Sequence, residues 1–526
     1  MSNALHIQKN DHYVTIYNED FIEKANHLKP ELYTTIVKPI SIVKVRKNSE
    51  VIHGWEVETE APISALNERK YRKDESFILD FGDHYVGYIS MNIRPVGSPP
   101  DAPLRLKLTI GEMPVEMAEP FEEYDGWLSS SWLQEETIYV DVLPGKIDLP
   151  RRYCFRYIKF EILDTSPKYQ VIFENVECKA VTSANIAGVK PLQHTDEMLK
   201  RIDKVSIKTL ADCMQDVFED GPKRDRRLWL GDLRLQALAD YETFKTKDLV
   251  KRCLYLFAGV PDDRGQVTAN VFTAPSLIAD DTVLYDYSLF FAATLHDYYF
   301  ATKDITTLKE LWPTAYRQIE LALARLDNRC IVKDSSDWWS FIDWKDGLNK
   351  QTPSQAILIY TMKQAIRLAE VLARPEKDWL EIQLTNTIEG AIKYLWDEQQ
   401  KFFISGDNRQ VSWASQIWMV LADILPFEEN KELMNRLLED KPECGLATPY
   451  MYHHLVEALI LVDEKEKAIS MMKLYWGGMI EDGADTFWEL YDPGNKNFSP
   501  YGSDLINSYC HAWSCTPTYL IRKYKL

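Results

Sequence analysis

Residues 199–217 read LKRIDKVSIKTLADCMQDV, and this stretch decides the fold class of the larger part of the chain. Its apolar side chains recur at the spacing of one face of an α-helix: Leu199, Ile202, Val205, Leu210, Met214 and Val217. Before about residue 190, apolar and polar residues alternate instead. We therefore predict two domains, residues 1–190 and residues 191–526.

Downstream of this stretch the helical period continues. We expect about twelve helical segments, which begin near residues 196, 232, 246, 279, 305, 353, 376, 412, 428, 448, 464 and 504. Six helical hairpins are what an (α/α)6 barrel needs, with inner helices that are apolar nearly all round and amphipathic outer helices. Because no repeat of about 30–45 residues recurs, an open solenoid is the weaker interpretation.

Upstream, short runs rich in β-branched and aromatic residues alternate with turns. We expect strands over residues 41–47, 75–82, 85–96, 103–112, 134–143, 151–163 and 169–181. LRLKLTI (104–110) and ETIYVDV (136–142) show the period of two that half-buried strands require. The pattern predicts an N-terminal antiparallel β-sandwich of the jelly-roll type.

Composition and charge exclude several classes of protein. The 526 residues contain 61 Lys and Arg against 80 Asp and Glu, and a net charge of −19 argues against a nucleic-acid partner. We find neither an apolar run of 18 residues nor a basic leader followed by an apolar stretch, so we expect no membrane span and no export signal. Eight cysteines at long spacings are typical of buried thiols in a reducing compartment. We expect a cytoplasmic protein, which could form a homo-oligomer.

Several tryptophans stand in polar segments between the expected helices. Trp338, Trp339 and Trp344 lie in DSSDWWSFIDWKDG, and Trp488 lies in ADTFWELYDP. Indole stacks on the apolar face of a sugar ring, while carboxylates and amides bind the hydroxyls. These segments indicate a carbohydrate site. For any single tryptophan, plugging the end of a helical hairpin is the alternative.

The densest polar segment is DGPKRDRRLWLGD, residues 220–232. Three carboxylates, Asp220, Asp225 and Asp232, alternate there with four cations, and Gly221-Pro222 forces a turn. Cations lower a carboxyl pKa, whereas burial and like charges raise it, so one acid can stay protonated beside an ionised one. Glycoside cleavage requires such a pair. A solvated, salt-bridged turn is the alternative.

Six segments, taken in order, resemble the α-L-rhamnosidases of glycoside hydrolase family 78: DGPKRDRRLWLGD, IADDTVLYDYSLFF, SFIDWKDG, ATPYMYHHLVEAL, GADTFWELYDP and SYCHAWSCTP. Two earlier segments, ILDFGDHYVGYISMNI and RRYCFRYIKFEIL, look like the β-domain that precedes the barrel in that family. The resemblance covers about residues 40–526. The first and fifth segments are its most specific parts.

The resemblance implies an (α/α)6 barrel that hydrolyses terminal α-L-rhamnosides with inversion. Carried over by position, Glu489 would be the general base and Asp225 the general acid. Many members of the family place a glutamate at or just after this point, where this chain has Asp225 followed by Arg226. The acid is therefore either Asp225 or Asp220.

The chemistry of the two carboxyls is consistent with this resemblance. An inverting glycosidase holds its carboxyls roughly 6.5–9.5 Å apart, so that a water molecule fits between one of them and the sugar. A closed barrel brings its first and last hairpins together, so loops from both can face one funnel. We expect the substrate to be contacted by residues of these loops, namely Asp220, Arg224, Trp229, Asp232, Asp343, Trp344, Trp488 and His511.

Other signals are weak. Cys510, His511 and Cys515 lack the paired spacing of a zinc site, and no nucleotide-binding or serine-hydrolase motif occurs, so we expect no metal and no cofactor. Three functions remain: an inverting α-L-rhamnosidase acting on rhamnose-containing glycosides or oligosaccharides, a barrel glycosidase of different sugar specificity, and a non-catalytic glycan-binding relative. Glu489 together with three acids in the first segment favours catalysis.

Overall fold

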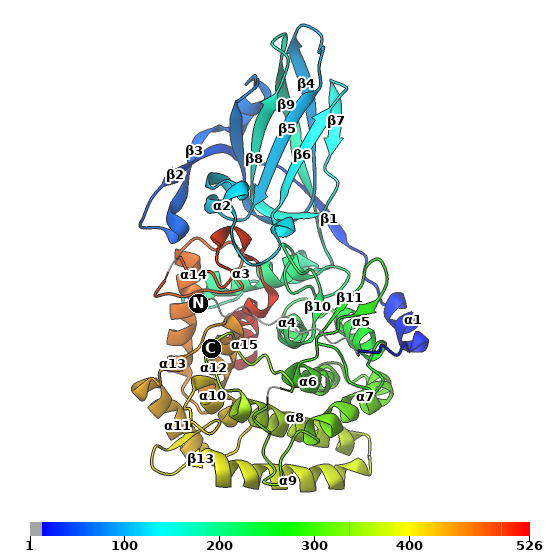
Figure 1. Cartoon of the computed structure of the whole chain (residues 1–526), viewed down its shortest axis with the longest axis vertical. Helices are drawn as coiled ribbons and strands as arrows, with labels where there is room; N and C mark the ends of the chain where they lie inside the picture. Colours follow the sequence, from blue (N-terminus) through cyan, green and yellow to red (C-terminus); the bar gives the residue numbers. More distant parts are fainter. Residues whose placement is uncertain (1–12, 336, 496) are drawn as a thin grey trace.

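Strands occupy the first part of the chain and helices the rest, as the hydrophobic period predicts (Figure 1). The computed structural model describes residues 13–335, 337–495 and 497–526. Residues 1–12 lie outside the described residues, so the structure does not bear on the expectation that the chain has no export signal. In Figure 1 the β-domain stands above the helical domain.

The β-domain consists of antiparallel strands. They are β1 (Tyr33–Val37), β2 (Ser41–Lys47), β3 (Trp55–Pro62), β4 (Ser76–Gly97), β5 (Leu104–Gly111), β6 (Glu135–Val140), β7 (Gly145–Asp148), β8 (Tyr153–Asp164) and β9 (Tyr169–Thr182). The runs expected over 75–82 and 85–96 form one long strand, β4, because the polar residues between them make a bulge. The register with β8 shifts between Asp80 and Tyr85, and Gly82 has a φ of +80°.

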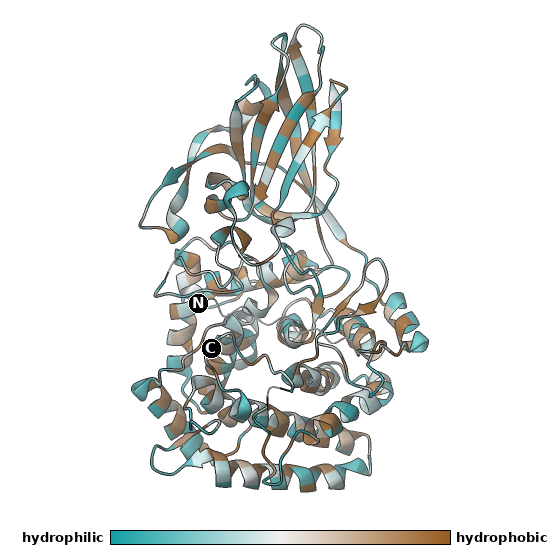
Figure 2. Cartoon of the chain, in the orientation of Figure 1, coloured by the Kyte–Doolittle hydropathy of each residue, from teal (hydrophilic) through white to brown (hydrophobic). Residues whose placement is uncertain are grey.

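Strand β4 passes from one layer of the sandwich to the other. Residues 76–80 pair with β8, and residues 87–97 pair with β9. The two layers enclose an aromatic core, in which Phe173 of β9 lies edge-on to Phe77 of β4 and Phe160 of β8, with ring centroids 5.1 and 5.3 Å apart. Along the strands, hydrophobic and hydrophilic residues alternate (Figure 2). The predicted sandwich is confirmed.

The helical domain is a closed double ring of helices. The outer helices are α3 (Glu197–Cys213), α5 (Lys247–Ala258), α7 (Ile305–Leu323), α9 (Glu376–Leu395), α11 (Phe427–Asp440) and α13 (Lys465–Met472). The inner helices are α4 (Leu230–Glu242), α6 (Tyr285–Thr302), α8 (Gln351–Val371), α10 (Trp413–Leu421), α12 (Pro449–Leu461) and α15 (Pro517–Tyr524). Each inner helix packs on the next, and α15 packs on α4 to close the ring. This is the predicted (α/α)6 barrel.

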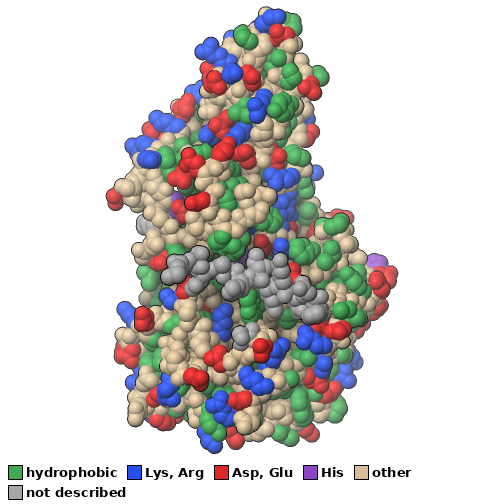
Figure 3. All heavy atoms as spheres, viewed as in Figure 1, with side chains coloured by type: hydrophobic (Ala, Val, Ile, Leu, Met, Phe, Trp, Pro, Cys, Tyr) green, Lys and Arg blue, Asp and Glu red, His purple; other side chains and the backbone are tan. Residues whose placement is uncertain are grey.

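Burial separates the two rings. In α4 every residue from Leu230 to Asp240 is buried, whereas α11 buries one stripe only, formed by Asn430, Leu433, Met434 and Leu437. No helix in the described part of the chain is long and apolar enough to cross a membrane. Acidic and basic side chains are mixed over the visible face of both domains (Figure 3).

The last inner helix begins later than predicted. A helix was expected near residue 504, but residues 504–506 form a single 3-10 turn and α15 starts at Pro517. The intervening segment is extended because it pairs with the loop that carries Glu489. The peptide N–H of Glu489 donates to Ser508 O at 3.0 Å, and that of His511 donates to Phe487 O at 2.9 Å.

The segment before β1 belongs spatially to the barrel. Helix α1 (Glu19–His27) packs against α5, with the rings of Phe21 and Tyr255 5.4 Å apart (Figure 1). Lys24 forms an ion pair with Glu310 of α7 at 3.1 Å. The segment that precedes the strands of the sandwich is thus bound to the helical domain.

Candidate active site

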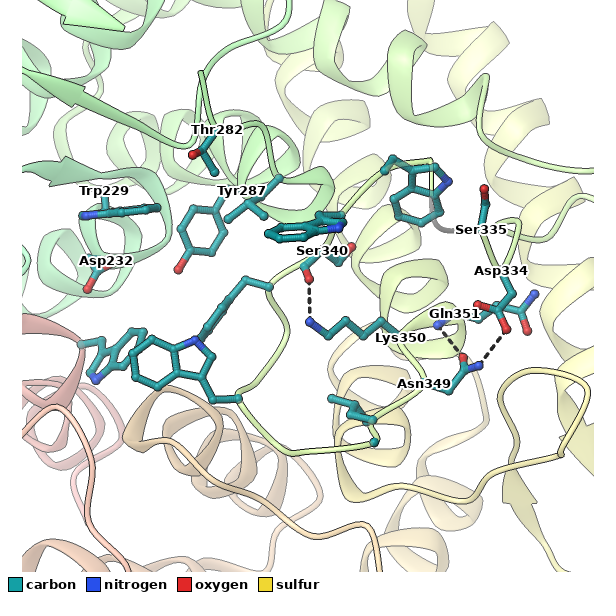
Figure 4. Close-up of a pocket in the computed structure, with 18 of the residues that line it drawn as sticks. Trp229, Asp232, Thr282, Tyr287, Asp334, Ser335, Ser340, Asn349, Lys350 and Gln351 are labelled. Carbon is teal, nitrogen blue, oxygen red and sulfur yellow. Dashed lines mark hydrogen bonds between the residues drawn. The ribbon is translucent and has the colours of Figure 1, made fainter. Parts of the chain in front are cut away.

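A cavity of about 720 Å³ opens where the inner helices begin. Trp229 and Asp232 stand at the start of α4, Tyr287 at the start of α6 and Gln351 at the start of α8, and all four line it (Figure 4). We call this cavity the funnel. Its walls come from the N-terminal ends of the barrel helices and from the loops before them, so a rigid scaffold positions every side chain.

The funnel has two ends (Figure 4). Trp229, Asp232 and Tyr287 lie at one end, and Asp334 and Asn349 lie at the other, where Asn349 Nδ2 donates to Asp334 Oδ2 at 2.7 Å. A cavity of this volume is in the range that takes a drug-sized ligand, which is larger than one monosaccharide. A single sugar bound at the first end would therefore leave the second end free for another part of the ligand.

Ring closure brings the first and last hairpins to the same place. The loop 220–229 follows α3, and the segment around Glu489 and His511 precedes α15. The peptide N–H of Ala512 donates to Asp220 O at 2.7 Å and ties the two loops together. Most predicted site residues line the funnel: Asp220, Asp225, Trp229, Asp232, Trp344, Glu489 and His511.

Glu489 is held as an acceptor. Its Oε1 accepts from the Tyr501 hydroxyl at 2.8 Å, and its Oε2 accepts from the Arg224 guanidinium, which stacks on the Tyr501 ring at 4.2 Å. Burial raises the pKa of Glu489, and the Arg224 charge opposes that rise. Arg224 was predicted to contact the substrate. The structure places it against Glu489, where it favours the ionised carboxylate.

The acids near α4 lack such donors. Burial and the charges of neighbouring carboxylates raise the pKa of Asp220 well above its ordinary value, and burial does the same for Asp232. His511 lies between them, with Nε2 3.9 Å from Asp220 Oδ2 and Nδ1 3.7 Å from Asp232 Oδ1. Burial lowers the pKa of His511 well below its usual value, so the ring is neutral. Asp232 Oδ1 and His511 Nδ1 are buried without a hydrogen-bond partner in the described residues.

Asp225 sits at a strained turn. Asp225 and Arg226 are consecutive residues with φ of 59° and 53°, a region that residues with a side chain rarely adopt. Such strain is characteristic of functional sites. Asp225 is half-buried, and its charge contributes to the raised pKa values of both Asp220 and Glu489, so these three carboxyls interact across the funnel.

The β-domain holds this turn from behind. Lys223 is 1% exposed and donates to Glu116 Oε1 of α2 (Pro114–Ala118) at 2.7 Å. It also donates to the backbone oxygens of Leu505 and Asn507, at 3.2 and 2.8 Å. One lysine therefore joins the β-domain, the turn that carries Asp225 and the segment that leads to His511.

Besides Arg224, two predicted substrate contacts do not line the funnel, namely Asp343 and Trp488. The Asp343 carboxylate accepts from Ala447 N, Thr448 N and the Thr448 hydroxyl at 2.9, 3.1 and 2.7 Å, and it fixes the start of α12. Burial raises the pKa of Asp343 to about 6. Trp488 is 2% exposed and packs edge-on against Tyr491. Asp343 has its oxygens occupied and Trp488 is buried in the core, and neither residue lines the funnel, so their contact with a substrate stays a prediction.

Sequence reasoning predicted Trp344 and Trp229 but missed the other aromatic residues of the funnel, Phe341, Trp513 and Tyr287. Phe341 stacks on Trp513 with centroids 5.5 Å apart, and Trp344 meets Trp513 edge-on at 5.1 Å. Tyr287 lies edge-on to Trp229. These residues belong to segments that the family resemblance had already singled out. Their closeness in sequence to Trp344 and His511 was the signal that could have identified Phe341 and Trp513.

Within the described part of the chain, two groups of side chains come close enough to hold a metal ion, and both contain His84. One adds Glu112 and Cys154, the other Asp212 and Cys510. They are buried at the domain junction, outside the residues that line the funnel. His84 Nδ1 lies 2.6 Å from Asp212 Oδ2, and Nε2 lies 3.0 Å from Glu112 Oε1. Both ring nitrogens already have carboxylate partners.

Comparison with known proteins gives the same picture of both domains. Residues 39–180 match the glycosyl hydrolase family 78 alpha-rhamnosidase N-terminal domain, and residues 191–524 match the bacterial alpha-L-rhamnosidase 6 hairpin glycosidase domain. No curated protein sequence matches the chain.

Solved structures extend the likeness over the whole length. A rhamnosidase from Klebsiella oxytoca with rhamnose bound is 49% identical, with a TM-score of 0.96 over 98% of this chain and 100% of that one. A family 78 rhamnosidase of Bacillus sp. GL1 (20% identical, TM-score 0.73, 89% of this chain and 49% of that one) shares the fold. So does an α-L-rhamnosidase of Streptomyces avermitilis complexed with L-rhamnose (15% identical, TM-score 0.64, 94% of this chain and 44% of that one). The chain belongs to the α-L-rhamnosidases of glycoside hydrolase family 78.

Proposed function

We propose that this rhamnosidase removes a terminal α-L-rhamnose from a glycoside or oligosaccharide in one displacement that inverts the anomeric centre. The proposal rests on one observation, namely that carboxyls in the same funnel have different hydrogen-bond and ion-pair partners. Glu489 receives hydrogen bonds from Arg224 and Tyr501, which favour its ionised form. Among the described residues, no lysine or arginine forms an ion pair shorter than 3.5 Å with the carboxyls of Asp220, Asp225 and Asp232, and His511 lies 3.9 and 3.7 Å from Asp220 and Asp232. Two carboxyls with opposed environments supply the base and the acid of a glycosidase.

In the reaction, Glu489 removes a proton from a water molecule, whose oxygen attacks the anomeric carbon. The bond from that carbon to the leaving oxygen breaks, and the general acid protonates this oxygen. We assign the acid role to Asp225, because it stands half-buried at the turn that faces the funnel. Asp220 is the alternative, although its Oδ1 already accepts from Arg227 N at 3.0 Å.

The same end of the funnel suits the sugar itself. The unpartnered atoms Asp232 Oδ1 and His511 Nδ1 offer hydrogen bonds to ring hydroxyls, since buried polar atoms require partners. The floor of Phe341, Trp344 and Trp513 offers an apolar surface to the ring and its methyl group. The bound rhamnose in the 49% identical Klebsiella rhamnosidase supports this choice of sugar. The leaving group then extends toward Asn349.

A panel of aryl glycosides tests the proposal. We expect hydrolysis of the aryl α-L-rhamnoside at least about 10²-fold faster, in kcat/KM, than that of aryl glycosides whose sugars leave Asp232 and His511 unpaired. Proton NMR should show the inverted anomer as the first product, before mutarotation. Glu489→Gln should abolish turnover while the protein stays folded. A retained product, or a covalent glycosyl-enzyme trapped in the wild type, would refute the single displacement.

A further inference from the structure

A second cavity, of about 950 Å³, lies at the opposite end of the barrel. The funnel is built from the beginnings of the inner helices, whereas this cavity is lined by residues near their ends. Tyr241 lies near the end of α4, His296 and Asp297 near the end of α6, and Gln364 in the second half of α8. The mechanism above uses none of them.

A column of aromatic rings separates the two cavities. Tyr450, which contacts Phe341 of the funnel floor, lies against His454 with ring centroids 4.6 Å apart, and His454 lies against Trp418 with centroids 4.3 Å apart. Trp418 then meets Tyr360, which lines the second cavity, at 6.0 Å. Trp418 and His454 are at most 1% exposed. A ligand in the second cavity must therefore enter from its own mouth, where Lys245 and Lys247 are exposed.

Several buried polar atoms in this cavity have no hydrogen-bond partner in the described residues. They are Tyr241 Oη, His296 Nε2, Asp297 Oδ2, Gln364 Oε1 and Arg234 Nε, the last of which lies 3.4 Å from Asp297 Oδ2. His296 and Gln364 are 6% and 7% exposed. His296 Nδ1 lies 2.9 Å from Asp297 Oδ1, and Nε2, on the other side of the ring, has no partner in the described residues. Unpartnered buried polar atoms are costly, and here both acceptors and donors of this kind lie in one cavity.

Aromatic rings supply the rest of the lining. Tyr519 and Tyr524 donate their hydroxyls to Glu457 Oε1 at 3.2 and 2.9 Å, and Phe300 lies beside them in the lining. The hydroxyls of the two tyrosines are thus occupied, and their rings form part of the cavity wall. Unpartnered polar atoms beside aromatic rings are the chemistry that binds a polyhydroxylated ring.

We propose that this second cavity is a binding site for a neutral sugar, separate from the catalytic funnel. Its hydroxyls would donate to Asp297 and Gln364 and would form hydrogen bonds with Tyr241 and His296, and its C–H face would rest on the tyrosines. An anion is disfavoured because Asp297 and Glu457 line the cavity and the one buried cation, Arg234, already lies 3.4 Å from Asp297 Oδ2. The exposed basic residues at the mouth disfavour a cationic ligand.

Binding of L-rhamnose, D-glucose and D-galactose tests the site. The measurement uses NMR titration of a His511→Ala variant, which weakens binding in the funnel, and crystals of the wild type soaked in each sugar. We expect at least one sugar to occupy the second cavity in the crystals. Adding Tyr241→Phe and Gln364→Leu should weaken the binding of that sugar to the His511→Ala protein about tenfold or more.

A matched control is Tyr475→Phe. Its hydroxyl is also buried and unpartnered in the described residues, but Tyr475 lines neither cavity. This variant should bind the sugar as its parent does. Tyr241→Phe removes a hydroxyl that makes no hydrogen bond in the described residues, so its unfolding temperature should not fall. A second cavity that stays empty in every soak, or undiminished binding by the Tyr241→Phe, Gln364→Leu protein, would overturn the proposal.

Discussion

Removing the hydroxyl of Tyr501 should move the pH dependence of the enzyme in a defined direction. The Tyr501 hydroxyl donates to Glu489 Oε1 at 2.8 Å, and both side chains are buried. In Tyr501→Phe this hydrogen bond to the carboxylate is lost, while Arg224 still binds Oε2. The ionised form of Glu489 is then less stable, and its pKa rises.

The size of the effect follows from the strength of such bonds. A hydrogen bond to a charged group contributes about 1.5–3 kcal/mol, and about 1.4 kcal/mol corresponds to one pH unit. The base must be ionised to accept a proton from water. The acid limb of the kcat/KM profile should therefore move up by roughly one to two pH units, with much of the activity recovered at higher pH.

Hydrolysis of an aryl α-L-rhamnoside across the pH range measures this limb. Tyr491→Phe is the matched control, because its hydroxyl also binds a carboxylate, Asp482 at 2.7 Å, outside the funnel lining. Its profile should overlay that of the wild type. If Tyr501→Phe lowers kcat/KM equally at every pH, or shifts the limb downward, Tyr501 does not tune the base.

Three further changes test other parts of the structure. Asp225→Asn should lower turnover about 10²-fold or more on substrates with poor leaving groups and less on activated aryl substrates; near wild-type activity with an inactive Asp220→Asn would transfer the acid role to Asp220. Lys223→Met leaves Glu116 buried without its cation, so the free energy of unfolding in urea at pH 7 should fall by about 3–5 kcal/mol. An unchanged urea midpoint would contradict the idea that Lys223 stabilises the domain junction. Burial raises the pKa of Asp240 to about 7, so the folded state binds this proton more tightly than the unfolded state, and the stability gained below about pH 4 is lost as the pH rises through 7. Asp240→Asn should therefore lose less melting temperature than the wild type between pH 5 and pH 8; equal losses would count against the raised pKa.

The periodicity of a sequence predicts helices and strands whose apolar side chains lie on one face and pack there. The stripe from Leu199 to Val217 marks α3 because its apolar residues pack on one side. The segment 504–516 is misjudged because distant residues determine its conformation. Tyr509 N donates to Glu112 Oε2 of the β-domain at 3.0 Å, a contact across 397 residues that no sequence window contains.

The same reason limits prediction of the site. Residue type and spacing point to the segments that surround the funnel, but they do not tell which side of an extended segment faces it. Trp488 and Glu489 are adjacent, yet one is buried in the core and the other lines the cavity. Tyr501 comes from a loop with no distinctive pattern. Its relation to Glu489 exists only in the folded chain.

Closure of the ring between α4 and α15 has a consequence for biosynthesis. Asp225 and Glu489 are separated by 264 residues, so at about 5–20 residues per second the ribosome adds Glu489 roughly 13–50 s after Asp225. During that interval the flank of α4 that later packs on α15 has no neighbour, and Arg224 has no carboxylate partner at 489. The nascent barrel therefore exposes apolar surface that chaperones recognise, and hydrolytic activity arises only when the last hairpin docks.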